Sequence, residues 1–191
     1  MPPSTSMQLV WPSLEHLPSY VAALQRGWSA DNLRGVAAAN EELERIATDP
    51  AAFLATMVDR EARGAPVALP NGATVPRLPG FRMWLWDGEL CGSIGFRWQT
   101  GTPTLPSYCL GHIGYAVVPW KRRLGFATAA LRQLLPLAKA EGLPYVELTA
   151  NPDNVASHRV IEANGGVFVE AFVMPPELGG HPELRFRIPL R

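Results

Sequence analysis

The hydrophobic pattern of the first 60 residues predicts one short strand followed by helices. Residues 7–11 form a short apolar run typical of a strand, and residues 13–28 have a helical pattern. Between residues 38 and 60, apolar side chains recur at helical spacing with acidic side chains between them. Asp49–Pro50 interrupts this stretch. Because proline suits the first position of a helix, we expect a new helix to begin there.

The middle of the chain has strand patterns separated by turn sequences. Residues 63–80 are rich in glycine and proline and have no periodicity, which predicts an ordered loop. The apolar runs 81–86 and 89–98 are joined by Asp87–Gly88. This pair predicts a β-hairpin with a type I′ turn, because that turn requires positive φ angles. A further strand pattern covers residues 110–118.

The last third of the chain alternates helices and strands. One apolar face runs from Leu124 to about Lys139 and predicts a helix, which Pro136 should bend or end early. A second, shorter helix should stop at the glycine pair 165–166, which suits a left-handed cap. A strand at 144–150 precedes that short helix, which covers 154–164. Two final strands follow at 167–174 and 184–190.

This order of elements predicts an α+β fold. Consecutive hairpins need antiparallel pairing, whereas a strand–helix–strand unit calls for a right-handed parallel connection. We therefore expect a three-layer structure with a central mixed, mostly antiparallel, twisted sheet and helices on both faces. A chain of 191 residues suits one domain, 1–191.

Composition excludes several classes of protein. Hydrophobic residues make up 47% of the chain and charged residues 18%, which is enough to form a buried core. The net charge is zero, and since nucleic-acid-binding proteins usually carry a basic excess, we expect no nucleic-acid partner. No apolar run approaches the ~18–20 residues that span a bilayer, and the N-terminus does not resemble a secretory signal. We therefore expect a cytoplasmic protein with no membrane partner.

Cysteine and histidine usage predicts neither disulfides nor a metal site. Cys91 and Cys109 lie in apolar, strand-like segments without paired spacing, which is typical of reduced, buried thiols. The four histidines are scattered singly along the chain, whereas metal sites need clustered ligands.

The segment 111–135 has a strand-to-helix pattern that can bind an anionic ligand. A strand ends at Pro119, and a helix follows within a few residues. The first turn of a helix offers unpaired backbone N–H groups and the positive end of the helix dipole. Gly125 and Ala127 let a ligand approach the backbone closely, while the residues 121–123 add positive charge. The segment is suited to a phosphate or pyrophosphate, although a plain strand-to-helix turn with exposed basic residues is the alternative.

The pattern R-x-x-G-x-A at residues 122–127 resembles the coenzyme A pyrophosphate loop of the GNAT acetyltransferases. Residues 117–119, Val-Val-Pro, stand where that family commonly has Val-x-Pro before the loop. Residues 145–150 and 154–166 follow in the family's order, with an asparagine near a helix start. The resemblance covers roughly residues 80–190. It implies an N-acetyltransferase that moves an acetyl group from acetyl-CoA to a primary amine of a small molecule or peptide, by direct attack in a ternary complex.

The resemblance also implies roles for residues of the donor site. Backbone amides from Arg123 to Thr128 would hold the pyrophosphate, and the strand edge at 115–117 would pair with the pantetheine arm. A backbone N–H near Val117 or Val118 would polarise the acetyl carbonyl. The cofactor-binding residues expected on this basis are Tyr115, Ala116, Val117, Arg122, Arg123, Leu124, Gly125, Phe126, Ala127, Thr128, Asn154 and Ser157.

The sequence offers candidates for the catalytic acid and base, each with an alternative role. Many family members carry a tyrosine that protonates the departing thiolate, but the matching position here is Ile161. Tyr115 is then an alternative donor, unless it only packs in the sheet. Glu147 and His112, on the strands after and before the loop, are candidate general bases. Their alternatives are an ion-paired glutamate and a structural histidine. An α-amine near pKa 7.7–8 is roughly 10% neutral at pH 7, so water and positioning would suffice for such an acceptor.

Two further expectations concern partners and activity. Residues 1–80 would supply the acceptor side and residues 81–191 the acetyl-CoA-binding core, with Trp84, Trp86 and Trp98 as candidate lining or core residues. The family resemblance is compatible with a homodimer. A catalytically weak or inactive acyl-CoA-binding sensor or scaffold is the alternative function, since Ile161 replaces the tyrosine; it predicts binding without turnover.

Overall fold

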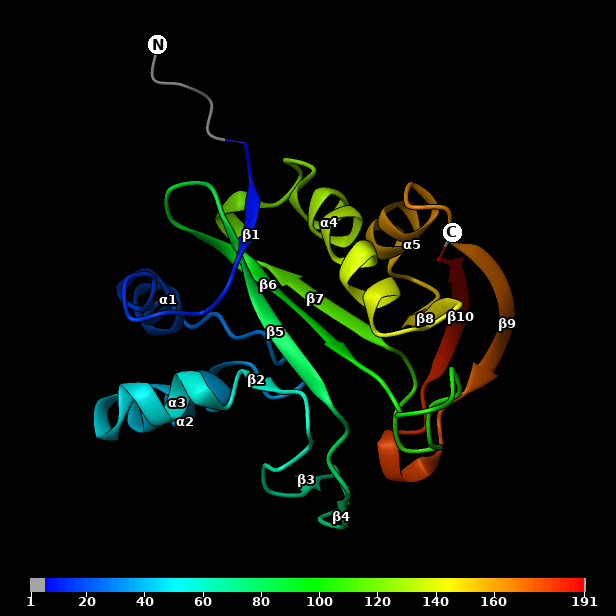
Figure 1. The fold of residues 1–191 in the computed structure, drawn as a ribbon, viewed down its shortest axis with the longest axis horizontal. Coiled ribbons are helices and arrows are strands. Elements are labelled where there is room, and N and C mark those ends of the chain that lie inside the picture. Colours follow the sequence, from blue (N-terminus) through cyan, green and yellow to red (C-terminus); the bar gives the residue numbers. More distant parts are fainter. Residues whose placement is uncertain (1–5, 191) are drawn as a thin grey trace. The chain divides into compact units, whose positions relative to one another are not determined.

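The computed structural model describes residues 6–190 (Figure 1). Its contacts divide the chain into two compact units. The first unit contains the chain up to Asp59, Phe81–Gly95 and Tyr115–Gln133; the second contains Arg60–Gly80, Phe96–Gly114 and the chain from Leu134 onwards. The assignment of residues 1–191 to one domain, with a division at residue 80, stays a prediction.

Three helices near the N-terminus belong to the first unit. They are α1 (Leu17–Gln25), α2 (Val36–Thr48) and α3 (Pro50–Ala55). The predicted helix start at Asp49–Pro50 is confirmed, because the Asp49 carboxylate accepts a hydrogen bond from the Ala52 N–H at 2.9 Å. This N-cap satisfies one of the donors that every helix start leaves open.

The sheet of the first unit has the strand order β1–β5–β6–β7. Its strands are β1 (Gln8–Val10), β5 (Gly80–Trp86), β6 (Leu90–Arg97) and β7 (Ile113–Val117), and the short β2 (Val58–Asp59) pairs with β5. The hairpin predicted around Asp87–Gly88 is confirmed. Its turn is not type I′, because that type needs two positive φ angles and only Gly88 has one, at 116°.

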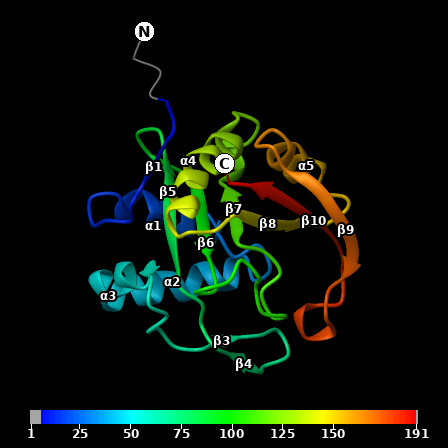
Figure 2. The same cartoon turned by 45° about the vertical axis from the view of Figure 1, so that its right-hand side comes forward.

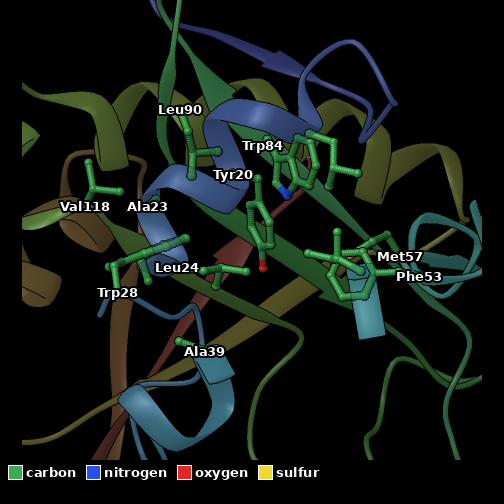
Figure 3. Packing of buried hydrophobic residues seen from close by; sticks show 13 residues of the cluster. Tyr20, Ala23, Leu24, Trp28, Ala39, Phe53, Met57, Trp84, Leu90 and Val118 are labelled. Atoms are coloured by element: carbon green, nitrogen blue, oxygen red, sulfur yellow. The ribbon is translucent and has the colours of Figure 1, made fainter. Parts of the chain in front are cut away.

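The core of the first unit is an aromatic and aliphatic cluster between the sheet and α1–α3 (Figure 3). Tyr20 stacks on Trp84 with ring centroids 4.6 Å apart, and both side chains are completely buried. The Tyr20 hydroxyl donates to Glu42 at 2.5 Å, so the buried phenol keeps a hydrogen-bond partner. Trp84 is therefore a core residue.

The second unit contains the antiparallel sheet β8–β10–β9 (Figure 2). Its strands are β8 (Tyr145–Ala150), β9 (Val167–Val173) and β10 (Pro182–Pro189), with α5 (Val155–Glu162) between β8 and β9 in the chain and the short 3₁₀ turn Pro176–Leu178 between β9 and β10. The prediction for residues 63–80 was incomplete. A small hairpin of β3 (Val67–Ala68) and β4 (Thr74–Val75) forms there, and two residues per strand are too few to show periodicity.

The helix α4 (Phe126–Ala140) continues past Pro136. The expectation that proline would end it early was wrong, although proline removes one hydrogen bond from the helix. Leu134 and Ala138 are completely buried, and this packing offsets the loss. The helix ends at Ala140, and Gly142, two residues later, has a φ of 84° that suits a left-handed cap.

The predicted α+β class and mostly antiparallel pairing are confirmed. Every strand pair with a described register is antiparallel, and the main ladders form two sheets. Within residues 6–190, no helix is both long and apolar enough to cross a bilayer.

Candidate active site

The loop between β7 and α4 has an unusual backbone. After the 3₁₀ turn Pro119–Lys121, Arg123 and Gly125 adopt left-handed φ angles of 65° and 77°. The first turn of α4 then closes through a hydrogen bond from the Ala129 N–H to the Gly125 carbonyl, at 3.0 Å. Where right-handed and left-handed backbone conformations alternate, successive N–H groups point to the same concave side of the chain. Such a concavity at the start of a helix binds anions.

This concavity is accessible. Residues 122–125 are all exposed, and a Cβ placed on Gly125 would meet no atom within 4 Å. Arg122 also contributes to the loop, since its Nε donates to the Val117 carbonyl at 3.3 Å. A ligand could therefore reach the backbone of this loop without rearrangement of a covering side chain.

Lys121 is bound to the β5–β6 hairpin instead of facing the concavity. Its Nζ donates to the two Asp87 oxygens at 2.6 and 2.8 Å and lies 2.8 Å from the Glu89 carboxylate. Burial opposes both charges, but the Lys121 hydrogen bond holds the pKa of Asp87 below its usual range, and the carboxylates raise the pKa of Lys121. Lys121 therefore anchors the loop, a role that sequence reasoning missed.

The strand before the loop is the end strand of its sheet. The Val118 N–H donates to the Cys91 carbonyl of β6 at 2.9 Å, and because backbone groups alternate along a strand, the Val117 N–H faces the opposite edge. Tyr115 and Val117 are half-buried, whereas Ala116 and Val118 belong to the apolar core.

Gly92 of β6 allows the backbone of β7 to approach closely. A Cβ at this position would lie 2.3 Å from the Ala116 carbonyl oxygen and 2.9 Å from the Val117 Cα. No side chain fits at those distances, so glycine shapes the strand edge on which the candidate residues lie.

In the second unit, His112 is completely buried against Glu147. The His112 backbone N–H donates to the Glu147 carbonyl at 2.7 Å, and Nδ1 accepts the Glu147 N–H at 2.9 Å. Burial lowers the pKa of His112. A neutral imidazole whose Nδ1 accepts a hydrogen bond carries its proton on Nε2, so neither nitrogen has a lone pair left for a substrate. These contacts favour a structural role.

Glu147 is held by two arginines of β10. Arg185 donates to Oε2 at 3.0 Å and Arg187 to Oε1 at 2.7 Å. Burial would raise the pKa of Glu147, but these hydrogen bonds lower it overall. The carboxylate therefore stays ionised and accepts protons weakly. The pattern Arg-x-Arg at 185–187 places both side chains on one face of a strand, but sequence reasoning did not use it.

The asparagine expected to contact the cofactor is the N-cap of α5. Asn154 Oδ1 accepts the Ser157 N–H at 3.1 Å, so only its Nδ2 is left to donate to a ligand. Ile161, where many family members have tyrosine, is buried and lies against Gly166.

In the described part of the chain, no group of three or more His, Cys, Asp or Glu side chains could hold a metal ion.

The structure thus groups the predicted residues in three places. The strand edge 115–117 and the loop 122–128 lie in the first unit. In the second, His112 contacts Glu147, and Asn154 contacts Ser157.

A family model of the acetyltransferase (GNAT) domain matches residues 26–167. The chain belongs to this family. It is an acyltransferase of the acetyl-CoA-dependent N-acetyltransferase class, as the two motifs predicted. No curated protein sequence matches the chain significantly.

Solved structures confirm the fold. Mycobacterium smegmatis RimJ in complex with CoA-disulfide is 19% identical, with a TM-score of 0.63 over 98% of this chain and 83% of that one. RimL, a ribosomal L7/L12 α-N-protein acetyltransferase in complex with coenzyme A, is 14% identical, with a TM-score of 0.62 and coverages of 99% and 97%. The microcin C7 self-immunity acetyltransferase MccE, in complex with acetyl-CoA and AMP, is 12% identical, with a TM-score of 0.61 and coverages of 96% and 92%.

Proposed function

We propose that this acetyltransferase transfers the acetyl group directly to a weakly basic primary amine, with the α-amino group of a peptide or amino acid as the acceptor class. One observation carries the acceptor proposal: both candidate general bases are engaged by other groups of the protein. His112 accepts a backbone N–H, and Glu147 accepts hydrogen bonds from two guanidinium groups.

The donor side of the proposal uses the β7–α4 loop. The amides of residues 123–128 and the exposed side chains of Arg122 and Arg123 would hold the pyrophosphate, and the β7 edge at 115–117 would pair with the pantetheine arm. The open, concave backbone at Arg123 and Gly125 supports this assignment. Asn154 would donate through Nδ2, with Ser157 beside it.

When bound, acetyl-CoA supplies the thioester whose acyl group is transferred. Of the two amides considered for the carbonyl oxygen, Val118 already donates to Cys91, so the proposal assigns this role to the Val117 N–H. A fixed donor at this oxygen stabilises the charge that develops during attack, commonly by ~2.7–4 kcal/mol. Tyr115, on the same strand face as Val117, would hold the proton needed by the departing sulfur.

The protonation of the acceptor explains the preference for an α-amine. A lysine side chain near pKa 10.4 is neutral in only a few parts per ten thousand at pH 7, whereas an α-amine near 7.7–8 is neutral at roughly 10%. Without a strong base, the α-amine starts with an advantage of several hundredfold in the reactive form. RimL is an α-N-protein acetyltransferase, and a Salmonella typhimurium acetyltransferase of similar fold modifies the N-terminal serine of a ribosomal protein; both activities are consistent with this acceptor class.

The proposal is tested with a peptide that offers both a free α-amine and a lysine, incubated with acetyl-CoA. Thiol release should accompany acetylation of the α-nitrogen, located by mass spectrometry, and the same peptide with a blocked N-terminus should release far less thiol. Acetylation confined to the lysine would refute the acceptor class. Micromolar binding of acetyl-CoA without thiol release from any amine would favour the acyl-CoA sensor instead.

A further inference from the structure

Arg26, the residue that follows α1, stacks on Trp120 in the 3₁₀ turn that opens the β7–α4 loop. The Cζ atom of Arg26 lies 3.4 Å from the centre of the Trp120 ring. A guanidinium group over an aromatic face is attracted by the negative potential of that face, and tryptophan is the strongest partner for it. Trp120 is 37% exposed, so burial in a core does not fix it. The stack therefore attaches an exposed residue of the loop to a helix.

The helix that carries Arg26 is itself fixed to the sheet of the first unit. Ser19 Oγ accepts the Leu90 N–H at 2.8 Å, which joins α1 to the start of β6. Ala23 of α1 belongs with Leu90 and Val118 to the buried cluster of Figure 3. The Arg26 backbone N–H donates to the Ala23 carbonyl at 3.2 Å and so continues the last turn of the helix. Arg26 therefore offers Trp120 a fixed surface.

Trp120 is the first of three consecutive residues whose side chains attach the loop to the rest of the first unit. Lys121 binds the β5–β6 hairpin, and Arg122 donates to the Val117 carbonyl of β7. The next residues are exposed, and Arg123 has a left-handed φ of 65°, which is unfavourable for a residue other than glycine. The conformation of this exposed backbone therefore depends on the three attachments before it.

We propose that Arg26 is a positioning residue for acetyl-CoA: its stack on Trp120 keeps the β7–α4 loop in the conformation that receives the pyrophosphate. This role rests on the donor site proposed above, and Arg26 acts in it only through Trp120. A cation over an indole ring changes an equilibrium by about two- to fivefold at an exposed site and by about thirtyfold where water is excluded. When fewer molecules hold the binding-competent loop, the apparent dissociation constant rises in the same proportion.

Substitutions at both ends of the stack test this role. Arg26→Gln removes the cation and Trp120→Leu removes the ring, and each should raise the dissociation constant for acetyl-CoA by about three- to tenfold in calorimetric titration. Because the two side chains act as a pair, the double variant should bind no more weakly than the weaker single variant. Arg26→Lys keeps a cation over the ring and should bind more tightly than Arg26→Gln.

Arg34→Gln is the matched control. Arg34 lies in the segment between α1 and α2, is exposed, and pairs with Glu41 instead of an aromatic ring. Its substitution removes the same charge from the same region of the chain. The Arg34→Gln variant should therefore bind acetyl-CoA like the unmodified chain.

Turnover and hydrogen exchange separate positioning from a purely structural role. With saturating acetyl-CoA, Arg26→Gln should keep the kcat of the unmodified chain while its KM for acetyl-CoA rises. The amides of Lys121 and Ala129, which donate to the Val118 and Gly125 carbonyls at 3.0 Å each, report on the two ends of the loop. Both amides should exchange faster in Arg26→Gln than in the unmodified chain, and amides of α2 should not change.

Four results would overturn the proposal. Unchanged affinity in Arg26→Gln, with a loss in Gly125→Ala, would remove the role of Arg26 and leave the donor loop in place. Losses that multiply in the double variant would show that the two residues act separately. A lower kcat with an unchanged KM for acetyl-CoA would assign Arg26 to another step. Unchanged affinity in both Arg26→Gln and Gly125→Ala would refute the donor loop, and with it the role of Arg26.

Discussion

His112 and Glu147 are joined by two hydrogen bonds that run in opposite directions. The backbone N–H of His112 donates to the Glu147 carbonyl at 2.7 Å, and the His112 ring accepts the Glu147 N–H at 2.9 Å. The imidazole thus accepts the Glu147 N–H of β8, as a backbone carbonyl of a neighbouring strand would. Protonation of Nδ1 would replace this acceptor with a donor and set it against the Glu147 N–H.

The first prediction concerns the stability of the fold at mildly acidic pH. Burial lowers the pKa of His112 below the unfolded value of ~6.5. The unfolded chain then binds a proton more readily, so the contribution of His112 to the free energy of unfolding is complete above about pH 7. It declines as the pH falls below ~6.5 toward the lowered folded pKa. Urea unfolding between pH 4.5 and 8 measures this loss.

Two variants of His112 separate the hydrogen bond from the titration. His112→Asn offers an amide oxygen to the Glu147 N–H, so it should retain much of the stability and flatten the pH dependence between 5 and 7. His112→Leu leaves a buried N–H unpaired and should cost about 1–3 kcal/mol above pH 7, and this difference from the unmodified chain should narrow as the pH falls below ~6.5. Equal pH dependence in the unmodified chain and His112→Asn would contradict the assignment.

The second prediction concerns the two glycines that flank α4. Gly125 and Gly142 have φ angles of 77° and 84°, and a Cβ would meet no neighbour at either position. Alanine at either site should therefore destabilise the fold by a similar ~1–2 kcal/mol, since both backbones are left-handed. Only Gly125→Ala should weaken acetyl-CoA binding, by tenfold or more in calorimetric titration. Equal loss of affinity in both variants would show that the loop has no special role.

The third prediction concerns Lys121, which the structure places against Asp87 and Glu89. Lys121→Met leaves the part-buried Asp87 carboxylate without its cation, so we expect a loss of about 1–3 kcal/mol in the free energy of unfolding. Acetyl-CoA affinity should fall as well, because the loop loses its anchor. Lys139→Met, at an exposed site on α4, is the matched control and should behave like the unmodified chain. A stable Lys121→Met protein with full affinity would refute the anchoring role.

The fourth prediction concerns the pH dependence of turnover. Hydrogen bonds from Arg187 and Arg185 hold the pKa of Glu147 below its usual range, so this carboxylate should not titrate between pH 6 and 8. The rise of kcat/KM with pH should instead follow the neutral fraction of the acceptor, and its midpoint should move with the pKa of each amine in a series. Glu147→Gln should leave that midpoint in place. One midpoint shared by all amines would indicate an enzymic base.

Several features of the site follow from local sequence alone. The helix start at Asp49–Pro50, the hairpin at Asp87–Gly88 and the loop before α4 depend on residues near one another in the chain. Proline at a first helical position and glycine at positive φ act through the backbone of their own segment, so pattern and spacing suffice to predict them. The family resemblance at residues 122–127 rests on the same short-range order.

Tertiary structure alone decided how the ionisable side chains are used. The partners of Lys121 are 34 and 32 positions away, at Asp87 and Glu89, and those of Glu147 come from the last strand. The continuation of α4 through Pro136 likewise depends on how deeply Leu134 and Ala138 are buried. Hydrophobic periodicity indicates which face of the helix is buried but not how completely. Sequence by itself determined the family, the order of elements and the donor loop, because these depend on local backbone chemistry. Which charges are paired and which base is engaged depends on contacts between distant segments, and only the folded chain defines those.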